Sequence, residues 1–119
     1  MASPPPPLPT YWFKLNTNGS SLGNPGLADG GGLIRNEKGE WVKGYARAIG
    51  NTTSAAAELW ALRDGIRLCI ALKLQAVVIK LDSKLMVELI KKELNNPNGL
   101  DVLVTDCRDG LRDIPQARI

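Results

Sequence analysis

Three residues whose side chains carry oxygen donor atoms lie where predicted helices and strands begin or end. Glu58 follows the start of a helical pattern, Asp82 directly follows an apolar run, and Asn18 precedes Gly19. Carboxylate and amide oxygens are ligands for divalent cations. Each residue also has an ordinary structural interpretation: Glu58 as a first-turn acid stabilised by its helix dipole, Asp82 or the following Ser83 as a helix cap, and Asn18-Gly19 as a turn. Cation chemistry therefore requires a fold that brings the three positions together.

The first half of the chain predicts three strands. Residues 11–17, 30–36 and 40–49 are rich in β-forming types, and turn residues separate them. The segment GSSLGNPG after the first strand is turn-rich, and Glu37–Gly39 (EKG) predicts a short hairpin turn. Because the connections are short, we expect an antiparallel meander.

The second half changes to a helical period. After Ser54, apolar residues recur at helical spacing, at Leu59, Leu62, Ile66 and Ile70. The following predicted elements are a buried strand at 76–81, a helix at 83–94, a helix at 101–114 and the start of a strand at 117–119. A meander followed by alternating helices and strands predicts an α/β fold with a mixed sheet. We expect the first strand and the 76–81 strand to be central neighbours, which brings positions 18, 58 and 82 toward one sheet edge.

Composition narrows the possible chemistry. The chain contains no histidine, which excludes Ser-His and Cys-His nucleophile pairs and zinc sites of the Cys/His type. Cys69 and Cys107 stand in apolar helical patterns, so we expect two free core residues. The net charge of +3 is compatible with nucleic-acid binding. The start MASPPPPLP lacks the features of a secretory signal, and we expect an intracellular protein, cytoplasmic or nuclear.

Several motifs in order resemble one known family. KLNTNGSSLGNPG, GGGLIRNEKGEW, AELWALRDGI and LDSKLMVELI are similar to the ribonuclease H type-1 family, closest to its plant retroelement-derived branch. The resemblance runs from about Pro5 to Ile119. It implies a ribonuclease H-like mixed five-stranded sheet, a meander followed by α-β-α-α-β. We expect residues 1–10 to be a proline-rich linker. Residues 11–119 would be a domain without the end of its last strand and the helix that follows.

The resemblance also implies a site. The family's enzymes cut the RNA strand of RNA–DNA hybrids, and four carboxylates hold two Mg²⁺ ions that activate water and stabilise the leaving oxygen. By position, the first three carboxylates fall on residue 18, Glu58 and Asp82. This chain departs from the pattern because Asn18 is neutral and the fourth carboxylate lies beyond Ile119. We therefore expect weak metal binding and weak or absent hydrolysis.

Substrate contacts are expected where family members touch the minor groove of the hybrid. By position these nucleic-acid-binding residues are Gly19, Ser20, Ser21, Asn24 and Ser54. Other members place asparagines near Ser54, and SLGNPG is also compatible with a simple tight turn.

Three functions remain open from the sequence. The first is a metal-dependent ribonuclease acting on RNA–DNA hybrids. The second is a catalytically inactive module that binds nucleic acid, and the third is a retroelement remnant. Lys84, Lys91 and Lys92 are candidate phosphate contacts or merely solvated helix charges. We expect a monomer that does not associate with a membrane.

Overall fold

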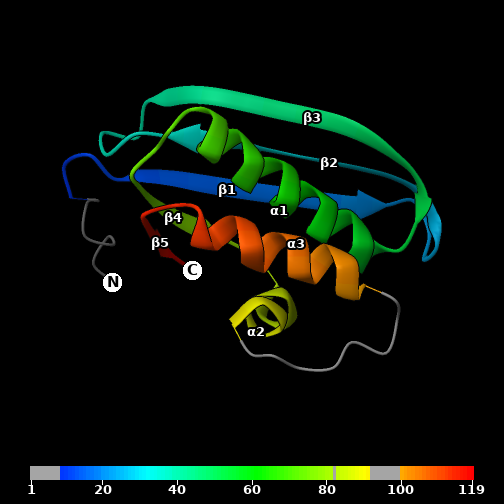
Figure 1. Cartoon of the computed structure of the whole chain (residues 1–119). Coiled ribbons are helices and arrows are strands. Elements are labelled where there is room, and N and C mark those ends of the chain that lie inside the picture. The colour runs from blue at the N-terminus through cyan, green and yellow to red at the C-terminus, as the bar shows by residue number, and fades with distance from the viewer. Residues whose placement is uncertain (1–8, 82, 92–99) are drawn as a thin grey trace, which may run out of the picture.

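The computed structural model describes residues 9–81, 83–91 and 100–119, which form a five-stranded sheet and three helices (Figure 1). Along the chain the elements are β1 (Phe13–Ser21), β2 (Gly26–Arg35), β3 (Trp41–Thr52), α1 (Ser54–Ala71), β4 (Ala76–Lys80), α2 (Lys84–Lys91), α3 (Asp101–Arg112) and β5 (Gln116–Arg118). The strand order across the sheet is β3-β2-β1-β4-β5. The mixed α/β sheet predicted from the sequence is confirmed. Residues 1–8 of the predicted linker (1–10) lie outside the described part of the chain, so the linker stays a prediction.

Strand pairing explains how the two halves of the chain meet. β1 pairs antiparallel with β2, and β2 pairs antiparallel with β3, as a meander requires. β4 returns beside β1 in a parallel pairing, and β5 adds to β4, also in parallel. β1 and β4 are therefore central neighbours, as the sequence predicted. Parallel neighbours end at the same edge of the sheet, and the starts of α1 and α2 lie near that edge.

The first hairpin differs from its prediction. β1 does not end at Thr17 but continues to Ser21, and Asn18 pairs with Gly31 inside the strand. The turn comes later, where the Leu22 N–H donates to the Leu27 carbonyl and Gly23 has a φ of +149°. The interpretation of Asn18-Gly19 as a turn was wrong, because the ladder to β2 overrides the weak strand propensity of these polar residues.

All of the described helices lie on one face of the sheet (Figure 1). α1 packs against β1, β2 and β3, and α3 and α2 pack against α1. α1 begins where the sequence predicted, because the Thr53 hydroxyl oxygen accepts a hydrogen bond from the Ala56 N–H at 3.1 Å. None of the described helices is long and apolar enough to cross a membrane.

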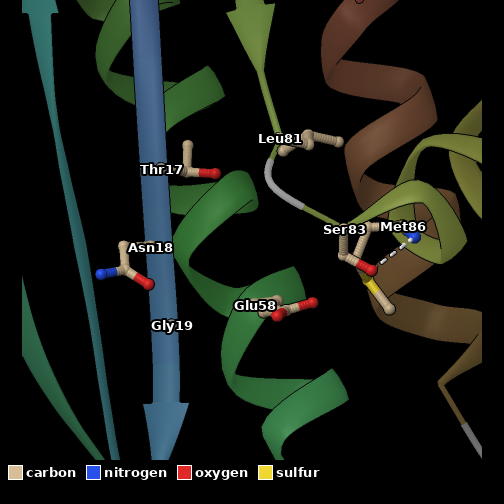
Figure 2. A pocket seen from close by; sticks show the side chains of 7 residues that line it. All are labelled: Thr17, Asn18, Gly19, Glu58, Leu81, Ser83 and Met86. Atoms are coloured by element: carbon tan, nitrogen blue, oxygen red, sulfur yellow. Dashed lines mark hydrogen bonds between the residues drawn. The ribbon is translucent and has the colours of Figure 1, made fainter.

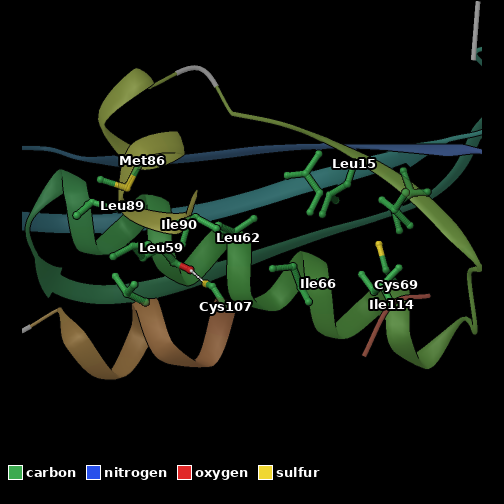
Figure 3. Close-up of a cluster of buried hydrophobic side chains, with 14 residues drawn as sticks. Leu15, Leu59, Leu62, Ile66, Cys69, Met86, Leu89, Ile90, Cys107 and Ile114 are labelled. Atoms are coloured by element: carbon green, nitrogen blue, oxygen red, sulfur yellow. Dashed lines mark hydrogen bonds between the residues drawn. The ribbon is translucent and has the colours of Figure 1, made fainter. Parts of the chain in front are cut away.

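The core fills the space between the sheet and the helices (Figure 3). Leu15 of β1 and Ile34 of β2 meet the apolar stripe of α1, which includes Leu59, Leu62 and Ile66. The two cysteines are free and fully buried, as predicted, and the Cys107 thiol approaches the Leu59 carbonyl at 3.7 Å. This shared core fixes α1 against β1.

Candidate functional site

A small cavity opens where β1 and the segment after β4 approach the starts of α1 and α2 (Figure 2). Its volume is about 40 Å³. The residues that line it are Thr17, Asn18, Gly19, Glu58, Leu81, Ser83 and Met86. Two of the three predicted metal-site positions, 18 and 58, therefore border one cavity.

Gly19 sets the distance between β1 and α1. A Cβ atom at this position would lie 2.6 Å from the Glu58 nitrogen and would also collide with the Ala57 carbonyl group. The backbone of the strand is thus in direct contact with the helix one residue before Glu58. A side chain at position 19 would push the two elements apart, so glycine is required here for close approach.

Glu58 stands in the second turn of α1, since the helix begins at Ser54. It is half-buried. In Figure 2 its carboxylate lies on the side of the helix that faces Ser83. The interpretation of Glu58 as a first-turn acid does not fit, because the first turn of α1 contains no acidic residue.

Asn18 borders two hollows. Its side chain projects from β1 on the side opposite Thr17, as strand alternation requires (Figure 2). Besides the small cavity, Asn18 lines an open hollow of about 590 Å³ together with Ser20, Asp29 and Gly31, among others. Asn18 is exposed. Its side chain therefore projects from the face of the sheet opposite the described helices, while the residue also borders the small cavity beside Glu58.

Asp82 lies outside the described residues, so its predicted role as a metal ligand stays a prediction. Its neighbours Leu81 and Ser83 both line the cavity beside Glu58. The Ser83 hydroxyl oxygen accepts a hydrogen bond from the Met86 N–H at 3.3 Å (Figure 2). Ser83 thus acts at the start of α2 as a capping residue.

The donor set expected for two Mg²⁺ ions is not present in the described residues. Within 9–81, 83–91 and 100–119, no three His, Cys, Asp or Glu side chains lie close enough together to hold a metal ion. The cavity offers the Glu58 carboxylate, the neutral Asn18 amide and the hydroxyls of Thr17 and Ser83. These oxygens suit Mg²⁺ chemically, but one negative charge does not make the implied four-carboxylate site.

Hydrogen bonds tie four of the five residues predicted to contact nucleic acid to the β1–β2 hairpin or to the start of α1. The Asn24 side-chain oxygen accepts a hydrogen bond from the Ser54 N–H at 3.1 Å, which ties the β1–β2 turn to the first residue of α1. Ser21 donates its hydroxyl to the Thr52 carbonyl at 3.1 Å, just before the same helix. Ser20 bonds to Asp29 across the hairpin at 3.3 Å. Residues far apart in the sequence are therefore held together at this edge.

A family model described as "Reverse transcriptase-like" matches residues 16–119, nearly all of the chain. The chain belongs to the reverse transcriptase-like family. It is a ribonuclease H-type domain, as its motifs indicated, and its mixed five-stranded sheet with helices matches ribonuclease H folds.

Relatives of this reverse transcriptase-like domain support the same assignment. It is 36% identical over 101 residues to a putative ribonuclease H protein of Arabidopsis thaliana. That match covers 85% of the chain but only 16% of the relative, so the chain spans about a sixth of that protein's length.

Solved structures share the fold. Ribonuclease H1 of the archaeon Halobacterium salinarum superposes with a TM-score of 0.85 at 22% identity, covering 91% of this chain and 83% of that one. A ribonuclease H1 isolated from compost, solved in complex with an RNA/DNA hybrid, gives a TM-score of 0.78 at 25% identity, with coverages of 89% and 81%.

Sequence reasoning missed several residues that line the cavity of this reverse transcriptase-like domain. Thr17, Leu81 and Met86 were not predicted as site residues. Thr17 could have been predicted, since it stands two residues before Gly19 and therefore on the same face of β1. Met86 carried no such signal, because its place depends on how α2 packs.

Proposed function

We propose that this ribonuclease H-type domain binds RNA–DNA hybrids at the edge where the β1–β2 hairpin meets the start of α1, and that it hydrolyses them weakly. The observation that carries the proposal is the hydrogen bond between the Asn24 side chain and the Ser54 backbone. It joins the two segments that the family resemblance assigns to the minor groove. A structural neighbour at 25% identity was solved with an RNA/DNA hybrid, which supports this choice of ligand.

The exposed polar groups of this edge suit a minor groove. Asn24 and Ser20 are both exposed at this edge. Hydroxyl and amide groups can donate to and accept from ribose 2′-hydroxyls, which distinguish RNA from DNA. The edge therefore offers shape and hydrogen bonds rather than recognition of particular bases.

Weak hydrolysis is proposed from the charge of the site. In the family, Mg²⁺ supplies the activation of water and the stabilisation of the leaving oxygen. An asparagine at position 18 contributes no negative charge, and Glu58 is the carboxylate that the described residues place at the cavity. A neutral amide in place of a carboxylate weakens the attraction for a dication, so we expect low occupancy by Mg²⁺ and slow cleavage.

A binding experiment tests the proposed edge. A fluorescein-labelled RNA–DNA hybrid is titrated with the full chain, and anisotropy is followed for the unchanged protein and for Asn24→Ala. The substitution removes the acceptor for the Ser54 N–H and frees the hairpin from α1, so we expect affinity to fall about tenfold, as for one lost contact of about 1–3 kcal/mol.

The matched control is Gln75→Ala, which removes an exposed amide that donates a hydrogen bond to the Lys73 carbonyl, beyond the other end of α1. It should bind like the unchanged chain. Equal losses in both variants, or no binding of hybrid by the unchanged chain, would contradict the proposed edge.

A further inference from the structure

A row of cationic side chains crosses the sheet on the face that the described helices leave open. Strand pairing places Arg118 beside Val78, Val78 beside Lys14, Lys14 beside Arg35, and Arg35 beside Trp41. Directly paired residues project from the same face of a sheet. One row across all five described strands therefore contains three cations and ends in a tryptophan. We call this face, defined by Lys14, Arg35, Trp41 and Arg118, the open face.

Alternation along the strands shows which face carries the row. Leu15 and Ile34 are fully buried under the helices. Their neighbours Lys14 and Arg35 therefore point to the other side of the sheet. Lys80 joins them from the adjoining row, where it pairs with Asn16.

The described residues provide no acidic partners for the cations of the open face. Within the described residues Arg47, Arg63 and Arg112 form ion pairs with aspartates, whereas Lys14, Arg35 and Lys80 form none. Lys14 and Arg35 stand directly opposite each other, and like charges in that arrangement repel. A polyanion laid across the row would neutralise both.

Trp41 supplies a second kind of contact on this face. It is 65% exposed, unusual for so large an apolar side chain. Its indole nitrogen lies 3.5 Å from the point where a Cβ of Gly44 would stand, so the ring lies against the open face of the sheet at Gly44. Gly31 and Ala46, which pair with each other on the same face, are also small residues. An exposed ring beside cations is how proteins stack bases of a single strand.

We propose that the open face binds single-stranded nucleic acid, with Lys14, Arg35 and Lys80 on phosphates and Trp41 stacked on a base. The row spans four strand spacings, or about 19 Å at about 4.8 Å each, enough for several nucleotides. The exposed tryptophan favours a nucleic acid over an acidic protein segment, which would not need an aromatic platform. The row crosses β1 at Lys14, near the start of that strand, whereas the hairpin edge proposed for hybrids lies at its other end, where Ser20 projects from the same face of the sheet.

Arg118 also lies on the open face, at its β5 end. Its guanidinium lies 4.5 Å from the centre of the Trp12 ring, and the side chain stays exposed. The stacking fixes the cation at the β5 end of the row. Because Trp12 is buried beneath it, Arg118 is left unchanged in the test below.

The test measures binding of a fluorescein-labelled oligouridylate by the full chain over a range of salt concentrations. The row variant is Lys14→Gln with Arg35→Gln and Lys80→Gln. The control variant is Lys43→Gln with Arg67→Gln and Lys73→Gln, three exposed cations away from the open face, since Lys43 pairs with the buried Ile34 and the other two lie on α1 or just after it. The row variant should lower the slope of log K against log salt by about 2, as expected for three lost phosphate contacts on a single strand. Trp41→Ala should weaken binding about tenfold.

Circular dichroism and thermal melting confirm that each variant is folded before binding is compared. The proposal is overturned if the control variant loses as much slope as the row variant, or if the unchanged chain does not bind at low salt. It is also overturned if polyglutamate of equal charge competes as well as the oligonucleotide and Trp41→Ala has no effect. The hybrid-binding edge is unchanged in all of these variants, so its success or failure is measured independently with Asn24→Ala.

Discussion

Position 18 determines how much negative charge the cavity beside Glu58 offers to a cation. Asn18 and Glu58 both line that cavity, and Asn18 is neutral. We predict that Asn18→Asp raises the affinity for Mg²⁺, because a second carboxylate is added near the first. Thermal melting with increasing MgCl₂ measures the effect, since an ion that binds the folded state raises the midpoint.

The control for added charge is Ser20→Asp, two residues along the same face of β1 and beside the existing Asp29. It adds the same charge away from Glu58. A magnesium response as large in Ser20→Asp as in Asn18→Asp would show that Asn18 is not the limiting residue.

Gly19 is predicted to be intolerant of any side chain. In Gly19→Ala the new methyl group would meet the backbone of Ala57 and Glu58, so β1 and α1 must separate. We expect a loss of about 1–3 kcal/mol in the free energy of unfolding, together with weaker hybrid binding. Urea denaturation measures the first quantity.

Gly44→Ala serves as the comparison, because the nearest atom to its new methyl group would be 3.5 Å away, an ordinary contact distance. A Gly19→Ala protein as stable as Gly44→Ala would contradict the close approach of strand and helix.

The site residues show what could be read from the sequence. The motifs singled out Asn18 and Glu58, and pairing of distant elements brings them to one cavity. The direction of the Asn18 side chain was not foreseen, because the strand was expected to end before it. With β1 continuing to Ser21, alternation fixes which side of the strand each residue faces.

At the scale of elements, Tyr45 joins β3 to α1. Its hydroxyl donates to the Ala61 carbonyl at 2.6 Å, and the same hydroxyl oxygen lies against Gly65, where any Cβ would collide with it. Burial raises the pKa of this phenol well above its ordinary value, and the Asp64 carboxylate adds to the shift. We predict that Tyr45→Phe costs about 1 kcal/mol of stability, since a half-buried carbonyl loses its extra donor.

Tyr11→Phe is the matched control, since Tyr11 is 57% exposed. Its melting midpoint should match that of the unchanged chain. If Tyr45→Phe also melts unchanged, the hydrogen bond to Ala61 contributes nothing to the attachment of β3.

The elements themselves were largely predictable. The change from an alternating to a helical period after Ser54 located the start of α1. The ends of the strands were predicted less well: β2 begins at Gly26 rather than Gly30, and β3 extends to Thr52 rather than Ile49. Those ends depend on ladder hydrogen bonds between strands, which local composition does not encode.

At the scale of the whole molecule, two buried thiols link stability to pH. Desolvation raises the pKa of Cys69 and of Cys107 from 9.0 to about 12. Between these values the unfolded chain releases the thiol protons while the folded chain keeps them. The stabilisation is therefore complete below about pH 9 and is lost as the pH rises toward 12.

We accordingly predict that the urea midpoint falls between pH 9 and pH 11, more steeply for the unchanged chain than for a Cys69→Ala, Cys107→Ala variant. The raised pKa of Tyr45 contributes a further loss at higher pH in both proteins. Identical pH profiles for the two proteins would show that the thiols are not the cause.

The proposed function separates binding from cleavage, and one sample can measure both. A labelled RNA–DNA hybrid is mixed with excess chain and MgCl₂, anisotropy gives the bound fraction, and gel analysis gives the single-turnover cleavage rate. The account predicts a bound hybrid that is cleaved slowly or not at all. Cleavage at an ordinary enzymatic rate that disappears in Glu58→Gln would contradict it, and so would a hybrid that stays unbound.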